Sequence, residues 1–398
     1  MLATAGGSPG WLLGPLRFAG APGADGRLAG PLFYAGLWLA LALYVAVLAT
    51  ARALPVRAAL GAVVALHVLF LLAPPLLSQD VFSYIAYARL GVEHHLNPYV
   101  HAPTAIPHDA VYGYAGSKDA VSAYGPLFTL LTYPLAPLGV AAAFWILKVV
   151  AAGASLGIML LVWRIAQRLG RDPLVPALAV GLHPLVLSHV VAGGHNEALV
   201  VLLTMAGVSL WVAGRDAPGA AVATVAAGVK ASAGLVVPFL IAARRPRLGA
   251  MVGAAAAAVI ALAAIGLAAF GSHALDAFRL IGDNQGRSSR FSLPYKTAQL
   301  LGALLPGDRL DYRDAVRALF AAAFAAALLW LVWRTWRGLT PALDAIGWAT
   351  LAILLASAWL VPWYVLWLLP FAALSRDRRL WIATLALSAW MLAIAVPL

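Results

Sequence analysis

The sequence predicts an all-α, polytopic membrane protein with about 10–12 transmembrane or re-entrant helices and two large outer loops. Of its 398 residues, 63% are hydrophobic and 11% are charged, whereas about one quarter of an ordinary soluble domain is charged. Many apolar runs reach the roughly 20 residues that a helix needs to cross a bilayer. Because lipid offers no water to hydrogen-bond the backbone, such runs predict helices.

Several segments have the length and composition of membrane spans. They are residues 32–50, 57–77, 140–163, 174–191, 197–213, 248–270, 315–333, 341–361 and 380–397. Two further apolar pieces, 218–242 and 363–373, are interrupted or short. Lys230 interrupts the first, which predicts two half-helices that meet at a polar turn. The second has about eleven residues, too few to span alone. Both are predicted to be broken or re-entrant elements.

Short basic clusters flank the spans and orient the chain. They are Arg52/Arg57, Arg164/Arg168/Arg171, Arg244/Arg245/Arg247, Arg334/Arg337 and Arg376/Arg378/Arg379. The positive-inside rule places these clusters in the cytoplasm. The loops 78–125 and 271–314 then lie together on the outer face and predict a chamber at that membrane surface. The chain is therefore expected in the cell membrane, with its site on the extracytoplasmic side.

One integrated transmembrane domain is expected over residues 31–398, after a flexible tail at 1–30. That tail is rich in Gly, Ala and Pro and lacks the basic start of a cleaved signal peptide. The net charge of +12 favours contact with anionic lipid rather than nucleic acid, because most of the charges flank spans. Cysteine is absent, so disulfide and thiol chemistry are excluded. No Walker A, dinucleotide-binding or nucleophile-elbow motif occurs, which disfavours a nucleotide-sugar domain.

Asp80 is the first charged residue after a long apolar run. A carboxylate so close to lipid indicates a functional site, here a general base facing the outer chamber. The alternative is a helix N-cap, a position that Asp favours. Ser83, Tyr84 and Tyr87 fall on one helical face, with Val81 and its apolar neighbours on the other. This pattern predicts an amphipathic helix at the membrane interface.

The rest of the first outer loop carries aromatic and amide side chains that could stack on sugar rings and bind their hydroxyl groups. The candidates are Tyr84, Asn97, Tyr99 and Tyr124. For each tyrosine, the alternative is an interfacial aromatic belt. The loop histidines lack the spacing of a zinc site, so no metal and no cofactor are predicted. These histidines are His94, His95, His101 and His108.

A second polar island, His195-Asn196-Glu197, follows a Gly-Gly pair between two apolar spans. Its position predicts a helix start that Asn196 could cap. Span parity places the island on the same face as Asp80, so these residues are also expected to line the chamber and to bind donor sugar or acceptor. The stretch with Trp363 and Tyr364 predicts either interfacial anchors or a lining of the acceptor groove.

Cations in unusual places indicate a phosphate site. Lys230 lies in apolar sequence and needs an anionic partner, which is either phosphate or a carboxylate such as Glu197. Lys148 raises the same question. In the second outer loop, Arg279, Arg287 and Arg290 break the positive-inside pattern, together with Lys296. They predict either a solvated face or contacts with the phosphate of a lipid-linked donor.

Five stretches together resemble the polyprenol-phosphomannose-dependent α-1,6-mannosyltransferases of actinobacteria. They are QDVFSYIAYARLGVEHHLNPYV, AYGPLFTLLTYPLA, LHPLVLSHVVAGGHNEALVVLLTMAG, VKASAGLVVPFL and PWYVLWLLP. The resemblance implies a GT-C glycosyltransferase fold. It also implies that Asp80 is the acidic base of the first outer loop. Glu197 stands where the family pattern has Asp, which bears on sugar or acceptor specificity.

The resemblance implies an inverting transfer of mannose from polyprenyl phosphomannose to a mannan or lipoglycan acceptor. Asp80 would take the proton of the acceptor hydroxyl. Lys230 and some of the outer-loop arginines would stabilise the charge that develops on the leaving phosphate. One alternative is a GT-C transferase that uses another polyprenyl-phosphate sugar, such as arabinose or glucose. Another is a flippase for polyprenyl-linked glycans, although the gathering of polar islands toward one face favours the enzyme.

Overall fold

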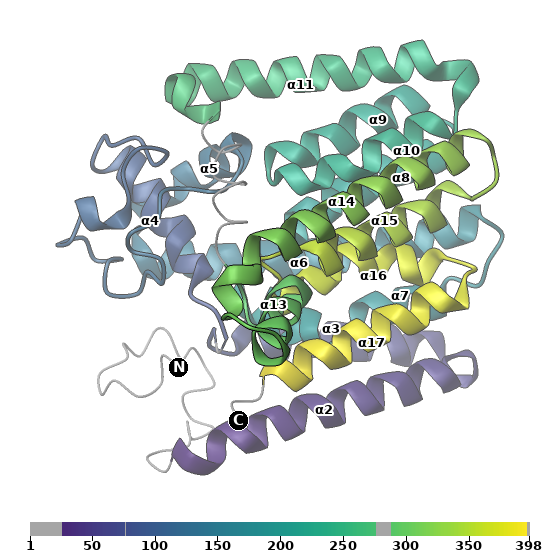
Figure 1. Cartoon of the computed structure of the whole chain (residues 1–398), viewed down its shortest axis with the longest axis horizontal. Coiled ribbons are helices and arrows are strands. Elements are labelled where there is room, and N and C mark those ends of the chain that lie inside the picture. Colours follow the sequence, from purple (N-terminus) through teal and green to yellow (C-terminus); the bar gives the residue numbers. More distant parts are fainter. Residues whose placement is uncertain (1–25, 76, 276–287, 396–398) are drawn as a thin grey trace.

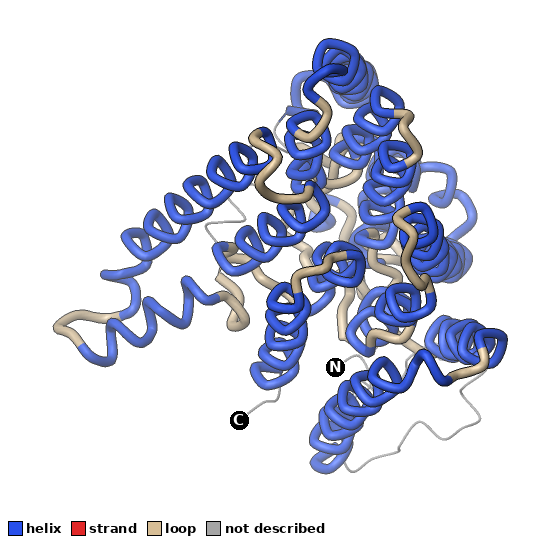
Figure 2. The backbone as a smooth tube through the Cα atoms, turned by 90° about the vertical axis from the view of Figure 1, so that its right-hand side faces the viewer, coloured by secondary structure: helices blue, strands red, loops and turns tan. Residues whose placement is uncertain are grey.

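The computed structural model describes residues 26–75, 77–275 and 288–395. Within these ranges every regular element is a helix (Figure 2), which confirms the predicted all-α class. Residues 1–25 of the expected tail lie outside the described part of the chain. The α-helices are α2 (Gly26–Thr50), α3 (Val56–Leu72), α4 (Asp80–Val92), α5 (Pro126–Thr132), α6 (Gly139–Arg168), α7 (Leu174–Gly181), α8 (Glu197–Val212), α9 (Asp216–Val225), α10 (Val237–Ala242), α11 (Leu248–Phe270), α13 (Leu293–Leu304), α14 (Arg309–Trp336), α15 (Ala342–Ala356), α16 (Val365–Leu374) and α17 (Arg378–Ala395).

Among the described residues, five helical segments are long and apolar enough to cross a membrane. They are Leu32–Ala53, Pro126–Arg168, Arg245–Ala274, Arg309–Trp336 and Arg378–Ala395. Shorter apolar helices, among them α3, α8 and α15, pack against these long segments. The outward side of α11 carries exposed Val259 and Ile260, as expected of a surface that contacts lipid. The chain is a polytopic membrane protein.

The helices lie roughly along one direction, and the two ends of the bundle differ (Figure 1). The turns after α2, α10, α14 and α16, which carry basic clusters, lie at one end. The α4–α5 region and the start of α14 lie at the opposite end. The described parts of the two predicted outer loops therefore share one end of the bundle.

The predicted half-helices around Lys230 are confirmed. Helix α9 ends at Val225 and α10 begins at Val237. Lys230 itself has an extended backbone, with φ −153° and ψ 121°. The second short apolar piece is also broken, because a 3₁₀ turn at Pro362–Tyr364 precedes α16. Both breaks place non-helical backbone in the interior, where protein rather than lipid surrounds it.

The prediction of one continuous span over 174–191 is wrong. Helix α7 ends at Gly181, and a π-helix occupies Val186–Val191. Pro184 lies between them and explains the break, because proline lacks a backbone N–H and disfavours helical geometry in the residue before it. The π-helical turn leads directly into the Gly-Gly pair and His195.

The prediction that α4 is an amphipathic interfacial helix is also wrong. Its side chains are buried on every face, including Tyr84, Tyr87 and Ile85. The outer loop covers one side, where Tyr87 donates a hydrogen bond to the carbonyl of Ala120 (2.9 Å). On another side, Phe82 stacks on Phe144 of α6, with ring centroids 5.4 Å apart. Helix α4 is therefore a core element that holds Asp80 in a fixed position.

Candidate active site

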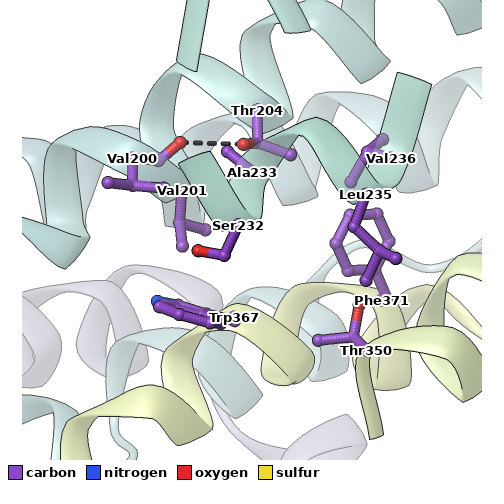
Figure 3. A pocket seen from close by; sticks show the side chains of 10 residues that line it. All are labelled: Val200, Val201, Thr204, Ser232, Ala233, Leu235, Val236, Thr350, Trp367 and Phe371. Carbon is purple, nitrogen blue, oxygen red and sulfur yellow. Dashed lines mark hydrogen bonds between the residues drawn. The ribbon is translucent and has the colours of Figure 1, made fainter. Parts of the chain in front are cut away.

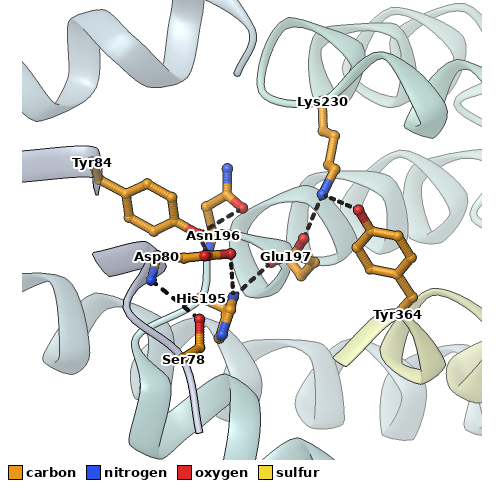
Figure 4. A network of polar contacts seen from close by, with 8 residues as sticks. All are labelled: Ser78, Asp80, Tyr84, His195, Asn196, Glu197, Lys230 and Tyr364. Atoms are coloured by element: carbon orange, nitrogen blue, oxygen red, sulfur yellow. Dashed lines mark hydrogen bonds and ion pairs between the residues drawn. The ribbon is translucent and has the colours of Figure 1, made fainter. Parts of the chain in front are cut away.

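Three segments far apart in the sequence bring polar side chains to one place (Figure 4). Asp80 is the first residue of α4, His195 to Glu197 lead into α8, and Lys230 lies between α9 and α10. We call Asp80, His195, Glu197 and Lys230 the central cluster. The predicted meeting of the two polar islands is thus present in the structure.

The alternative prediction, that Asp80 is the N-cap of α4, is wrong. Gln79 occupies that position, and Asp80 is the first helical residue. Its backbone N–H donates to Ser78 Oγ (3.1 Å), while its carboxylate faces His195 with 37% of the side chain exposed. The surrounding protein removes water and raises the pKa of this carboxyl, although the nearby His195 lowers it. A carboxylate with a raised pKa is a stronger base.

His195 lies between two carboxylates. Its Nδ1 is 3.6 Å from Asp80 Oδ2 and 3.5 Å from Glu197 Oε2. The imidazole ring packs against Trp363, with centroids 4.1 Å apart. The turn before it depends on Gly194, which has φ +66° and lies in the left-handed region that glycine tolerates. Trp363 and the Gly194 turn together fix the imidazole in its buried position.

Asn196 occupies the N-cap position of α8, as predicted, but its side chain makes no capping bond. Instead its Oδ1 accepts a hydrogen bond from the Tyr84 hydroxyl (3.3 Å), and its backbone N–H donates to the same hydroxyl (3.4 Å). Tyr124 packs edge-on against the Tyr84 ring, with centroids 4.8 Å apart. These contacts attach α4 to the start of α8.

Glu197 and Lys230 form the strongest ion pair of the cluster. Lys230 Nζ lies 2.5 Å from Glu197 Oε1 and 3.2 Å from the Tyr364 hydroxyl. The Lys230 ammonium also lies over the Tyr364 and Trp367 rings, 4.5 Å and 5.2 Å from their centroids. The predicted alternative, in which Lys230 pairs with Glu197, is therefore confirmed. The glutamate reaches both His195 and Lys230.

Several buried polar atoms in this region have no hydrogen-bond partner within the described residues. They are His195 Nδ1, His195 Nε2, Asn196 Nδ2 and Glu197 Oε2. Buried polar groups in proteins are nearly always paired, so such a gathering is typical of a site that a ligand or water completes. These atoms comprise both donors and acceptors, which suits hydroxyl groups.

A cavity of about 470 Å³ opens beside the cluster. Lys230, Tyr364 and Trp367 line one part of it, and apolar side chains of α14 and α15, such as Phe324 and Ile353, line the rest. Gly125 also lines the cavity, and a Cβ there would lie 2.1 Å from the carbonyl oxygen of Gly228. Only glycine allows the start of α5 to approach the Lys230 segment so closely.

A smaller cavity of about 30 Å³ lies deeper in the protein, between α8, α15 and α16 (Figure 3). It shares Ser232 and Trp367 with the large cavity. Ser232 Oγ and Trp367 Nε1 are buried without partners among the described residues. The volume is large enough for a water molecule, and both residues line it.

Not every predicted site residue reaches the central cluster. Asn97 donates to the carbonyl of Phe270 in α11 (2.9 Å) and accepts from the backbone of Tyr99 (3.0 Å). The Tyr99 hydroxyl donates to the carbonyl of Tyr124 (2.8 Å). Both side chains thus support the loop and not the site. Arg290 donates to the carbonyl of Ala395 (3.1 Å), whereas Arg279 and Arg287 lie outside the described residues.

Sequence reasoning missed two participants. Ser78 holds the backbone of Asp80, and Ser232 lines both cavities. Ser232 follows Lys230 by two residues, so the polar interruption of that apolar stretch was the available signal. Trp367 belongs to the stretch with Trp363 and Tyr364 that was predicted as interfacial anchors or a lining of the acceptor groove; it stacks on Tyr364 with centroids 4.3 Å apart and faces Lys230.

Comparison with known proteins covers most of the chain. Residues 16–246 match the family model described as "Alpha-(1->6)-mannopyranosyltransferase, N-terminal domain", and residues 297–398 match the MptB C-terminal domain. The chain is 32% identical to α-(1→6)-mannopyranosyltransferase A of Mycobacterium tuberculosis, over 82% of this chain and 67% of the relative. It is 27% identical to a probable α-(1→6)-mannopyranosyltransferase of Mycolicibacterium smegmatis, over 80% and 65%.

A partial match extends to α-(1→6)-mannopyranosyltransferase A of Corynebacterium glutamicum, which is 29% identical over 44% of this chain and 37% of the relative. The chain thus spans about two thirds of the first relative's length and less of the other two. No solved structure matches it significantly. These matches confirm the predicted resemblance and the assignment to the glycosyltransferases. The chain therefore belongs to the α-(1→6)-mannopyranosyltransferase family.

Proposed function

We propose that the chain transfers mannose from polyprenyl phosphomannose to a mannan or lipoglycan acceptor, forming an α-1,6 bond with inversion on the extracytoplasmic side. The observation that carries this proposal is the position of Lys230. It lies where the polar central cluster meets the cavity of about 470 Å³ with apolar walls. A donor with a phosphate head and a prenyl tail matches that combination of charge and apolar surface.

The phosphate of the donor is assigned to Lys230. An ammonium has three N–H donors, and Glu197 and Tyr364 accept two of them. The third is available to a phosphate oxygen in the cavity, while Phe324 and Ile353 offer apolar contacts to the prenyl chain. Glu197 keeps Lys230 charged and aimed, because an opposite charge at this distance favours the ammonium form.

The transfer needs one proton acceptor and one site of positive charge. Asp80 takes the proton of the acceptor hydroxyl, and the hydroxyl oxygen attacks the anomeric carbon of the mannosyl phosphate. The bond between that carbon and the phosphate oxygen breaks, and its electron pair leaves with polyprenyl phosphate. Lys230 stabilises this developing charge. Attack from the face opposite the leaving group inverts the anomeric centre.

The unpartnered polar atoms of the cluster and of the adjacent Asn196 are assigned to sugar hydroxyl groups. His195, Asn196 and Glu197 each present at least one buried atom without a partner among the described residues. A site built to hydrogen-bond hydroxyl groups leaves such atoms unpaired until the sugar binds, and it then discriminates strongly against sugars that lack the group. This supports sugar recognition beside Asp80.

The orientation in the membrane rests on charge. The basic turns after α2, α10, α14 and α16 lie at the end of the bundle opposite the α4–α5 region (Figure 1). The positive-inside rule places basic turns in the cytoplasm. The α4 end, with Asp80, then faces the extracytoplasmic side.

The test is mannose transfer in membranes that contain wild type, Asp80→Asn or Asp119→Asn at matched expression. Labelled polyprenyl phosphomannose and a short α-1,6-mannan serve as substrates. Asp119 is a matched control, because it is an exposed aspartate of the same loop outside the cluster. We expect transfer to fall by about 10²–10⁴-fold in Asp80→Asn, the range for loss of a general base, and to persist in Asp119→Asn.

Equal transfer by Asp80→Asn and wild type would exclude Asp80 as the base. Absence of transfer by wild type would contradict the proposed donor or the proposed acceptor. Parallel assays with polyprenyl phosphoarabinose and polyprenyl phosphoglucose would then identify another sugar. Release of polyprenyl phosphate during transfer is required, since it is the leaving group.

A further inference from the structure

A second cavity of about 470 Å³ lies at the C-terminal end of α4, in the outer loop and away from Lys230. Its charged and polar lining comes from five side chains, and Ile106 contributes an apolar part. The five are Arg89, Glu93, His94, His108 and Asp109. None of these side chains belongs to the central cluster.

The base of this cavity is rigid. Asp109, whose side chain is 1% exposed, accepts hydrogen bonds from Arg89 Nε (2.8 Å), His94 Nε2 (2.8 Å) and the backbone of Val111 (2.9 Å). Burial alone would raise the pKa of Asp109, but these bonds and the charge of Arg89 lower it to about 2. Arg89 also donates to the carbonyl of Ala136 (3.0 Å). The cavity is therefore formed before any ligand arrives.

The side chains at the rim of the cavity are available to a ligand. The side chains of Glu93 and His108 are exposed and make no hydrogen bond or ion pair with the described residues. Next to His94, His95 has φ +54°, a left-handed conformation that non-glycine residues seldom adopt. Strained backbone of this kind gathers at binding sites. A rigid base with free polar groups at its edge is the arrangement of a preformed binding site.

The chemistry of the lining selects the class of ligand. Asp109 already neutralises Arg89, and Glu93 adds negative charge, so phosphate and other anions are disfavoured. No group of three or more His, Cys, Asp or Glu in the described ranges has metal-binding geometry. The charged and polar rim disfavours a lipid chain. A neutral ligand with many hydroxyl groups fits this lining best, because the lining presents both hydrogen-bond donors and acceptors.

We propose that this cavity is a distal subsite that binds sugar units of the glycan acceptor beyond the one that reacts. The proposal rests on the proposed function, which supplies a glycan acceptor on the same side. Asp80 and Arg89 are nine positions apart on α4, which corresponds to roughly 14 Å along the helix. That separation is too large for the reacting sugar and fits a neighbouring part of an oligosaccharide chain.

The test compares acceptors of different length. Linear α-1,6-linked mannobiose and mannotetraose are titrated by calorimetry into the purified full chain as wild type, Glu93→Ala, His108→Ala and Asp119→Ala. In wild type, the tetraose is expected to bind about tenfold more tightly than the biose, which equals about 1.4 kcal/mol. Glu93→Ala and His108→Ala should each remove most of that difference. Asp119 is an exposed residue of the same loop and does not line the cavity. Asp119→Ala should therefore leave the difference in affinity between the two oligosaccharides unchanged.

Equal affinity of wild type for the two oligosaccharides, or no affinity for either, would overturn the subsite. A length preference that survives in both Glu93→Ala and His108→Ala would also overturn it. Both substitutions are at exposed side chains, so thermal unfolding of each variant is expected to match wild type. Binding is measured without the donor. If wild type shows the length preference but transfers no mannose, the proposed function fails, and the cavity stands as an oligosaccharide-binding site and no longer as an acceptor subsite.

Discussion

Lys148 and Lys230 are two lysines in apolar helical sequence, and the structure gives them different surroundings. Lys230 lies at a break between half-helices, pairs with Glu197 and lines a cavity, with 19% of its side chain exposed. Lys148 lies within α6 and is completely buried. It donates to the carbonyl of Ala73 and lies near the Phe144 and Trp145 rings. In the described part of the chain, no carboxylate pairs with it.

The difference teaches that an intramembrane lysine indicates function only together with its partners and its access. Lys230 has a carboxylate that keeps it charged, and it lines the cavity in which we propose that the donor phosphate binds. Lys148 instead links α6 to the end of α3, whose chain leads to Asp80. A Cβ at Gly194 would lie 3.3 Å from Lys148 Cγ, so Lys148 also packs against the turn before His195. Its contacts thus join α6 to the two segments that lead to Asp80 and His195.

The largest expected effect is that of Lys230→Met. Transfer should fall by about 10²–10³-fold, the usual cost of losing one charge-stabilising donor. The unfolding free energy should also fall by about 3–5 kcal/mol, because Glu197 is left as an unpaired buried charge. Initial rates at matched expression and thermal unfolding in detergent measure the two effects.

The double variant Lys230→Met/Glu197→Gln separates these two effects. It removes the uncompensated carboxylate charge, so stability should return toward that of wild type while transfer stays low. If the double variant transferred mannose at the wild-type rate, Lys230 would not be needed for transfer, and the proposed difference between Lys230 and Lys148 would be wrong.

An intermediate effect is expected for Asp109→Asn, which tests a buried charge with a full set of partners. The folded pKa of Asp109 is about 2, below its ordinary value of 3.8. The carboxylate therefore adds stability above about pH 4, and that contribution is lost as pH falls through 2. This difference in pKa corresponds to about 2–3 kcal/mol. Unfolding midpoints measured from pH 6 to pH 2 should fall less steeply in Asp109→Asn; parallel curves would show that Asp109 adds no such stability.

The smallest effect is expected for Lys148→Met. Transfer should decrease by less than about tenfold, or about 1.4 kcal/mol, because this side chain lines neither of the two cavities beside the central cluster. Stability should change little, since removing a buried charge offsets the loss of the donor to Ala73. Rates and unfolding are measured beside Lys230→Met. A loss of transfer as large as that of Lys230→Met would show that Lys148 also takes part in the reaction, and the two lysines would no longer differ in function.

Local sequence predicted much of the site. A carboxylate after an apolar run identified Asp80, a Gly-Gly pair before three polar residues identified His195 to Glu197, and an interrupted span identified Lys230. Asn97 and Tyr99 were assigned to the site because sugar sites use such side chains. Their actual contacts are long-range: Asn97 bonds to Phe270 in α11, and no local pattern encodes that partner.

The amphipathic prediction for α4 failed for a related reason. The spacing of Ser83, Tyr84 and Tyr87 correctly indicates a polar face. That face is covered by protein, because Tyr84 bonds to Asn196 and Tyr87 to Ala120. In a membrane protein with large loops, a polar helix face can be directed inward as well as toward water. Periodicity distinguishes the faces and does not say what lies against them.

The sequence by itself determined the all-α membrane class, the half-helices around Lys230 and the identity of the residues in the central cluster. Hydropathy, proline and intramembrane charge act within a few residues and can be read locally. Only the tertiary structure decided that Glu197 pairs with Lys230, that Lys148 is buried against the end of α3, and that Asn97 bonds to α11. These outcomes depend on side chains from distant segments meeting in a water-poor interior, where each polar group must find a partner.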